Sequence, residues 1–382
     1  MQRIRVLHVY KFYLPHMGGI ERSIQLIVDN MRDDLIDFRV LACSHNASSE
    51  STKEVIGGVQ VVRTNSIGTL FSTPLSISFF VAFRDLLKSA DILHIHSPFP
   101  LGEISYLLFR PKGKKLVVTY HADISQTRWA CFAPFYKHVL RSLLERADRI
   151  VVTSPAMIQH SPQLYPFQNK CRVIPLAMGL EKLDPSTPEK EKDLRDRLRL
   201  SSGKIVLFVG RLTYQKGLNY LIDAMQEIEA TLILIGDGEL KEKLIKKSSH
   251  LGINDKIHFV GRVSEDELPV YYSIADVFVL PSISGGETFA VVQLEAMAFG
   301  VPVVNTSLLT GVTFVSPHNE TGLTVPPRDS SALAEAINKI LKDDALRLRF
   351  SDNARKRARL FSLDRMLIET RKLYAEVIDK DI

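Results

Sequence analysis

The sequence predicts an α/β protein built from two parallel-sheet domains, and three observations support this fold class. The chain has 382 residues, which is long for a single hydrophobic core. Short β-forming apolar runs alternate with segments of helical periodicity, as in parallel sheets covered by helices. Residues 175–200 shift to prolines and dense mixed charge, which indicates a linker into a second domain.

The composition is that of a globular protein, with 45% hydrophobic and 24% charged residues. The three cysteines, Cys43, Cys131 and Cys171, are far apart, which argues against a disulfide framework or a Cys-rich metal site and fits a reducing cytoplasm. No apolar run approaches the roughly 18 residues of a spanning helix. The net charge of +6 permits attraction to anionic lipid or phosphate-bearing substrates, and no nucleic-acid partner is expected.

The first half of the chain begins with a β-loop-α unit. Ile4 to Tyr10 is a β-rich run, and Gly18-Gly19 opens the helical pattern of Ile20 to Met31. Amides at such a loop can approach an anion closely, although an ordinary tight turn has the same pattern. Further β-rich runs of this half are Phe38 to Cys43, Val59 to Arg63, Ile92 to His96, Leu116 to Tyr120 and Ile150 to Ser154.

Three histidines lie at or just beyond these strand ends. His94 and His96 share one strand face, but no third ligand is spaced nearby in the sequence, so no metal site is expected. His121, in the run VVTYHAD, is predicted to lie in the crevice between the two domains. The alternative for His121 is a strand-end histidine that makes only structural hydrogen bonds.

Residues Arg128 to Arg149 mix aromatic and aliphatic residues with basic ones. This composition predicts an amphipathic basic helix, which Pro134 should divide. Such a stripe either faces the core or lies on a membrane surface.

The second half opens with a strand, Ile205 to Val209, the loop GRLTYQKG and a helix from Leu218. Arg211 and Lys216, five positions apart at a helix entrance, form a plausible cradle for a diphosphate. Two solvated cations are the alternative. Strands followed by glycine turns recur at Thr231 to Ile235 with Gly236, and at Ile257 to Val260 with Gly261 and Arg262.

The stretch from Pro281 to Val304 is predicted to run from a strand end through a glycine loop into a helix and a further strand. Glu287 should lie at the helix entrance, and Gly300 and Pro302 should end the helix. Glu287 and Glu295 are eight positions apart, so both would approach one face and one extended ligand. Two solvated acids are the alternative, but an unpaired Glu295 within LEAMA would be costly without a ligand or partner.

These motifs resemble those of the retaining, nucleotide-sugar-dependent glycosyltransferases of family 4. Their signature is E-x7-E followed by a run of the type E-A-M-A-x-G-x-P-V-V, which matches Glu287 to Val304. The loop GRLTYQKG matches their G-R-L-x-x-x-K-G motif. The chain departs from the family at Thr288, where a glycine is usual, and this change would alter the donor-sugar pocket.

The resemblance implies the GT-B fold, in which two Rossmann-like domains face each other across a cleft. The first domain would span residues 1–178, the second 179–361, and a C-terminal helix in 362–382 would cross back to the first. The catalytic residues would be His121, Arg211, Lys216 and Glu287. The donor would be bound by Gly18, Gly19, Arg211, Lys216, Gly261, Arg262, Glu287, Thr288, Phe289 and Glu295.

The runs HIHSPFPLGE and VVTYHADI add a resemblance to bacterial O-antigen or capsule mannosyltransferases that use GDP-mannose. This implies a polyprenyl-diphosphate-linked glycan acceptor and a cytoplasmic enzyme, peripheral on the anionic inner leaflet. No metal or other cofactor is expected. A UDP-sugar-dependent transferase of the same fold, a GT-B phosphorylase or epimerase, and a non-enzymatic glycan-binding module are the alternatives, the last opposed by the combination of Arg211, Lys216 and Glu287.

Overall fold

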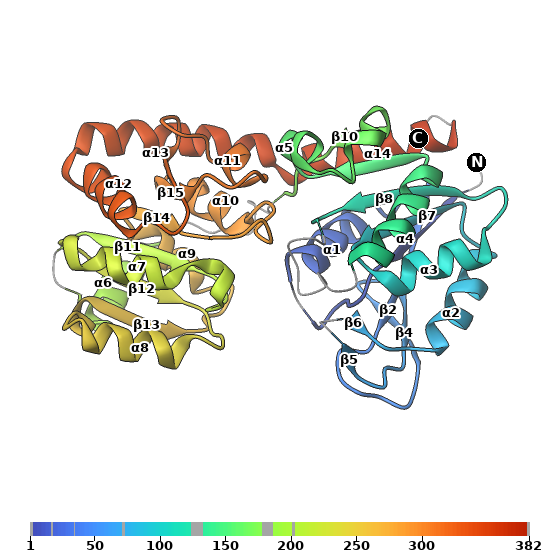
Figure 1. Cartoon of the computed structure of the whole chain (residues 1–382), viewed down its shortest axis with the longest axis horizontal. Coiled ribbons are helices and arrows are strands. Elements are labelled where there is room, and N and C mark those ends of the chain that lie inside the picture. The colour runs from blue at the N-terminus through green and yellow to red at the C-terminus, as the bar shows by residue number, and fades with distance from the viewer. Residues whose placement is uncertain are drawn as a thin grey trace. The chain divides into compact units, whose positions relative to one another are not determined.

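The computed structural model describes residues 3–379 except 17, 34, 71–72, 124–132, 178–185 and 201–202. The chain divides into two compact units (Figure 1). Unit 1 comprises Met1–Leu176 and Leu363–Ile382, and unit 2 comprises Ala177–Ser362. Among the described residues, no helix is long and apolar enough to cross a bilayer.

Unit 1 is an open sheet of eight strands in the order β10-β9-β8-β7-β1-β2-β4-β3, in which only β3 pairs antiparallel. Its strands are β1 (Ile4–Val9), β2 (Ile36–Cys43), β3 (Thr52–Ile56), β4 (Val59–Thr64), β7 (Ile92–Ser97), β8 (Lys115–Tyr120), β9 (Arg149–Val152) and β10 (Cys171–Val173), with the small pair β5 (Thr69–Leu70) and β6 (Thr73–Pro74). Its helices are α1 (Gly19–Met31), α2 (Ser78–Leu87), α3 (Pro100–Phe109), α4 (Ala133–Arg146), α5 (Pro155–His160), the 3₁₀ turn η2 (Tyr165–Lys170) and α14 (Leu363–Ile378).

Unit 2 is an all-parallel sheet of six strands in the order β13-β12-β11-β14-β15-β16. Its strands are β11 (Ile205–Val209), β12 (Thr231–Ile235), β13 (Ile257–Gly261), β14 (Val277–Leu280), β15 (Val303–Thr306) and β16 (Gly322–Val325). Its helices are α6 (Pro188–Arg197), α7 (Leu218–Ala224), α8 (Lys241–His250), α9 (Leu268–Ser273), α10 (Val291–Ala298), α11 (Val312–Val315), α12 (Ser330–Lys342) and α13 (Asp344–Ala358), with the 3₁₀ turns η4 (Tyr214–Lys216), η5 (Met225–Glu227), η6 (Asn254–Lys256) and η7 (Arg359–Phe361).

The predicted α/β class and the return of the C-terminal helix to the first domain are confirmed. Helix α14 belongs to unit 1 and lies against α1. Tyr374 of α14 is fully buried, and Glu376 forms ion pairs with Arg149 and Arg172 beside the sheet edge. The C-terminal segment is therefore part of the core of unit 1.

The predicted linker at 175–200 is partly wrong, because it contains helix α6. Thr187 caps this helix by accepting from the amide of Lys190, and Pro188 occupies its first position. Glu189 lies in its first turn and Arg197 in its last, which complements the helix dipole. The high charge that suggested a linker belongs to the exposed sides of this helix.

Candidate active site

Glycine turns follow three neighbouring strands of unit 2 at the carboxyl edge of the sheet. Gly210 follows β11, Gly236 follows β12, and Gly261 ends β13, all with positive φ. A Cβ on Gly236 would lie 2.0 Å from the carbonyl oxygen of Gly210, so only glycine allows these two loops to meet. Ligands bind at this edge in open parallel sheets, so the glycine turns leave backbone groups accessible there. Arg262, next to Gly261, is exposed.

Gly217 positions the loop that carries Lys216. It has φ of 67°, and a Cβ there would lie 1.9 Å from the carbonyl oxygen of Pro281. The amide of Ile283 also donates to the carbonyl of Gln215 at 2.9 Å. These backbone contacts bring the loop after β11 against the loop after β14.

As a result, Lys216 and Glu287 form an ion pair, although 71 residues separate them. Each side chain is only 11% exposed. The hydroxyl of Ser282 donates to the same carboxylate oxygen at 2.9 Å. Arg211 is exposed and forms no ion pair with any described residue. The positive charge of Lys216 is thus balanced by the Glu287 carboxylate, while Arg211 is available to an anionic ligand.

Helix α10 begins later than predicted, at Val291, because Ala290 adopts the left-handed conformation with φ of 59°. Glu287 therefore lies in the loop before the helix, so the helical spacing that was used to relate it to Glu295 does not apply to it. The carbonyl of Thr288 accepts from the amide of Gly311 at 2.7 Å. The Phe289 side chain is 1% exposed and packs edge-on against Phe361, so its ring belongs to the core.

Glu295 has a protein partner. The hydroxyl of Tyr272 donates to the Glu295 carboxylate at 2.6 Å, and the Tyr272 ring stacks on Phe299. Burial, reinforced by the Glu295 charge, raises the pKa of Tyr272 well above its ordinary value. The sequence predicted that Glu295 would need a ligand or partner, and Tyr272, on helix α9, is a residue that the sequence analysis missed.

In unit 1, Gly18 and Gly19 form the entrance of helix α1 and are both exposed. A Cβ on Gly18 would lie 2.6 Å from the nearer carboxylate oxygen of Glu21, so a larger residue there would make the Glu21 side chain shift. Glu21, which no sequence motif marked, is 4% exposed. Its carboxylate adds a negative charge at the helix entrance where an anion was expected.

His121 lies at the carboxyl end of β8 and is 4% exposed. Its amide donates to the carbonyl of Ser97 at 2.9 Å, and its Nε2 lies 3.1 Å from Nδ1 of His96. Burial, and secondarily the Lys11 charge, lowers the pKa of His121 to about 3. The imidazole is therefore neutral at physiological pH.

Three further imidazoles gather on the same face of the sheet. His8 pairs in register with His94 across β1 and β7, and His8, His94 and His96 bring ring nitrogens within 4.8 Å of one another. The sequence spacing gave no third ligand near His94 and His96, but the pairing of β1 with β7 brings His8 beside them from 86 residues away. Every ring nitrogen of these three histidines already has a hydrogen-bond partner, so a metal ion would have to displace those bonds.

The predicted basic helix is represented by α4, while residues 128–132 lie outside the described residues. Pro134 lies in the first turn and does not divide the described helix. One side of α4 is core, formed by Tyr136, Leu140, Leu143 and Leu144. The other side exposes Phe135, which is 71% exposed, together with Lys137, His138 and Arg141. The helix therefore has both a core-facing stripe and a basic outer face.

Two family models match the two halves of the chain. The model described as Glycosyltransferase Family 4 matches residues 17–182, and the model described as Glycosyl transferases group 1 matches residues 189–357. The D-rhamnosyltransferase WbpZ of Pseudomonas aeruginosa is 32% identical, over 87% of this chain and 86% of that protein. The O-antigen chain mannosyltransferase C of Escherichia coli is 28% identical, over 98% of this chain and 99% of that protein.

A GDP-mannose-dependent alpha-(1-6)-phosphatidylinositol monomannoside mannosyltransferase of Mycobacterium tuberculosis is 30% identical, over 89% of each chain. Among solved structures, a sucrose-phosphate synthase from Thermosynechococcus elongatus superimposes with a TM-score of 0.82 and 25% identity, over 99% of this chain and 100% of that one. Anabaena HepE in complex with UDP superimposes with a TM-score of 0.77 and 20% identity, over 98% and 100%.

Proposed function

We propose that this chain, which belongs to the family-4 glycosyltransferases with the GT-B fold, is a retaining mannosyltransferase that uses GDP-mannose. Its acceptor would be a polyprenyl-diphosphate-linked glycan in O-antigen or capsule synthesis. The E. coli and M. tuberculosis relatives support this choice, because both are named mannosyltransferases and one is named for GDP-mannose.

The observation that carries this proposal is the cluster of Arg211, Lys216 and Glu287 beside the glycine turns of unit 2. A departing nucleoside diphosphate gains negative charge as its bond to the sugar breaks, so cations at this point stabilise the transition state. Arg211 is available to bind the diphosphate. Lys216 would leave its ion pair with Glu287 and bind the diphosphate instead. The released Glu287 carboxylate would then accept hydrogen bonds from hydroxyls of the transferred sugar.

In the proposed reaction, the bond between the anomeric carbon and the diphosphate oxygen breaks, and the diphosphate keeps the electron pair. The acceptor hydroxyl oxygen forms the new bond on the same face of the sugar, and its proton passes to the departing diphosphate. Glu295 would accept from the nucleotide ribose, with Tyr272 holding the other side of its carboxylate. Neutral His121 would hydrogen-bond a sugar hydroxyl.

A second candidate donor sugar is D-rhamnose, which the P. aeruginosa relative is named for transferring. D-rhamnose is 6-deoxymannose, so the two sugars differ by one hydroxyl. A site that hydrogen-bonds that hydroxyl would reject the deoxy sugar strongly, while an apolar pocket would discriminate less. A comparison of the two GDP-sugars therefore reports the polarity of the pocket around carbon 6.

The deciding experiment is a donor panel of GDP-mannose, GDP-D-rhamnose, UDP-glucose and ADP-glucose, measured as nucleoside diphosphate release with and without a polyprenyl-diphosphate glycan. GDP release from GDP-mannose is expected. Arg211→Ala should lower turnover by about 10²-fold, because it removes a charge-assisted contact to the leaving group. Lys246→Ala, an exposed cation on α8, is the matched control. Turnover of UDP-glucose alone, or phosphate-dependent cleavage of the glycan, would exclude the proposed donor.

We also propose reversible attachment to an anionic inner-leaflet surface through the outer face of α4. An exposed phenylalanine among Lys137, His138 and Arg141 suits a helix lying at a lipid interface. This attachment would bring the enzyme to a lipid-linked acceptor.

A further inference from the structure

A continuous hydrogen-bonded chain of side chains crosses the covered face of the unit 1 sheet. It starts at Thr119, whose hydroxyl oxygen lies 2.6 Å from Nε2 of His94. Nδ1 of His94 lies 2.7 Å from the hydroxyl of Tyr374, which lies 3.3 Å from Nε2 of His8. The chain continues through His8 and His96 to His121, in contacts from Nδ1 to Nε2 at 2.9 Å and 3.1 Å.

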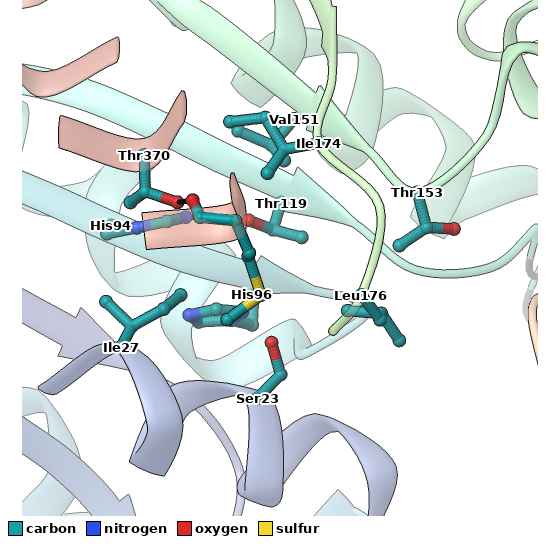
Figure 2. A pocket seen from close by; sticks show the side chains of 11 residues that line it. Ser23, Ile27, His94, His96, Thr119, Val151, Thr153, Ile174, Leu176 and Thr370 are labelled. Atoms are coloured by element: carbon teal, nitrogen blue, oxygen red, sulfur yellow. Dashed lines mark hydrogen bonds between the residues drawn. The ribbon is translucent and has the colours of Figure 1, made fainter. Parts of the chain in front are cut away.

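Helices α1 and α14 pack on this face of the sheet. Figure 2 shows His94 and His96 near Ser23 and Ile27 of α1, and near Thr370 of α14. A cavity of about 20 Å³ beside the two imidazoles is lined by these same elements. Tyr374 reaches the chain from α14 and is fully buried. Every ring nitrogen of His8, His94 and His96 lies within hydrogen-bond distance of another member of this series of side chains.

All four imidazoles are neutral. Burial lowers the pKa of His8 to about 3 and the pKa values of His94 and His96 well below the ordinary value. A neutral imidazole has one N–H donor and one acceptor nitrogen, and a tyrosine hydroxyl has one proton. Each member that sits between two neighbours must therefore donate to one and accept from the other. Only two proton orders satisfy the whole chain, one running in each direction.

The distances around Tyr374 favour one of these orders. Its contact to His94 at 2.7 Å has the length of an O–H donor, while the contact to His8 at 3.3 Å suits a longer N–H donor. With Tyr374 donating to His94, His8 donates to Tyr374, and His96 donates to His8. His121 then donates from Nε2 to His96, which leaves its Nδ1 as an acceptor. Nδ1 of His121 makes no hydrogen bond to a described residue and is the ring atom left for a ligand.

We propose that Tyr374, His8 and His96 are positioning residues that hold His121 in the tautomer protonated on Nε2, so that its Nδ1 accepts a hydrogen bond from a hydroxyl of the bound sugar. The role of His121 toward sugar rests on the proposed function above. The hydrogen-bonded series of side chains connects that role to the C-terminal helix α14, because the hydroxyl of Tyr374 decides the direction in which the protons are ordered.

Tyr374→Phe tests this directly. Without the hydroxyl, the buried Nε2 proton of His8 has no acceptor, and an unpaired buried donor is costly. The reversed order leaves His8 with an unpaired acceptor instead, which proteins tolerate better. His8 then donates to His96, His96 donates to His121, and His121 carries its proton on Nδ1. The variant should therefore switch the tautomer of His121.

The readout is nitrogen NMR of the full chain with histidine-selective ¹⁵N labelling, in which His121→Gln assigns the His121 signals. The wild type should show His121 protonated on Nε2, and Tyr374→Phe should show it protonated on Nδ1. Tyr13→Phe is the matched control, because Tyr13 is equally buried and its hydroxyl has no hydrogen-bond partner among the described residues. It should leave the His121 tautomer unchanged. A wild-type His121 protonated on Nδ1, or an unchanged tautomer in Tyr374→Phe, would overturn the proposal.

Sugar-transfer assays on the same variants keep the two proposals separate. Tyr374→Phe should lower kcat about tenfold, the loss of one hydrogen bond in the transition state, and Tyr13→Phe should not. A tautomer that switches while kcat stays unchanged would overturn the positioning role and leave the glycosyltransferase intact. Absence of mannosyl transfer in the wild type would overturn the proposed function, while the NMR spectra would still decide the proton order.

Discussion

Acidification to pH 5 should lower the unfolding free energy of unit 1 more than that of unit 2. The reason is that the buried histidines of unit 1 are neutral in the folded state and take up protons only when the unit unfolds. The folded-state pKa values of His8 and His121 are about 3, against about 6.5 for an exposed histidine. Below pH 6.5 the unfolded chain therefore binds protons that the folded chain does not, and stability falls as pH falls from about 6.5 to about 3.

The size of the loss follows from these two groups. Each histidine lowers the unfolding free energy by about 1.4 kcal/mol for every pH unit below about 6.5, which amounts to about 2 kcal/mol at pH 5. Together they remove about 4 kcal/mol, and the lowered pKa values of His94 and His96 act in the same direction. A typical domain is stable by only about 5–15 kcal/mol, so unit 1 should lose a large part of its stability.

Hydrogen-exchange mass spectrometry in a urea series, at pH 7.5 and pH 5 and corrected for intrinsic exchange rates, would measure both units in one sample. Unit 2 is the internal control, because His250 and His318 are exposed and His258, whose pKa burial lowers, is only half-buried. The ring of His8 lies beside that of Phe38, so His8→Phe puts an apolar ring in an aromatic environment. This variant should reduce the slope of the unfolding free energy against pH by about one proton, whereas His160→Gln, at an exposed position, should not. A change below about 1 kcal/mol in the unfolding free energy of unit 1 would refute this reasoning.

Three further outcomes follow from the proposed active site. Transfer should survive EDTA, because protein cations serve the diphosphate; loss of activity with rescue by magnesium or manganese would contradict this. Calorimetric titration of GDP should show binding weaker by about 1–3 kcal/mol in Glu295→Ala, which loses a contact to the ribose. Glu287→Ala should not weaken GDP binding, because it frees Lys216 from its ion pair. The opposite pattern would contradict the assignment of Glu295 to the ribose and Glu287 to the sugar. Phe135→Ser should reduce sedimentation of the enzyme with anionic liposomes at low salt, and high salt should release the wild type; equal sedimentation of both proteins would exclude α4 as the contact.

The strands and the glycine loops were predictable because their signals are local. The apolar runs that form β1, β7 and β11 are short and bounded by turn residues, and α10 ends before Gly300 and Pro302 as expected. The hairpin of β3 with β4 was missed, because β3 is a half-exposed edge strand without a continuous apolar run. The start of α10 was misplaced because a left-handed alanine has no distinctive sequence signal.

The residue types of the site were set by the sequence, but their partners were decided by tertiary structure. The motif around Arg211 and Lys216 indicated a diphosphate cradle, while the ion pair to Glu287 depends on two loops that meet at Gly217. Tyr272 reaches Glu295 from a different helix.

The buried histidine chain shows the same division most clearly. Strand periodicity placed His94 and His96 on one face, because alternate residues of a strand point the same way. The addition of His8, His121 and Tyr374 required the pairing of β1 with β7 and the packing of α14 on the sheet. Sequence spacing carries no information about partners 86 or 280 residues away, because such contacts arise only when separate strands and helices bury their apolar faces together.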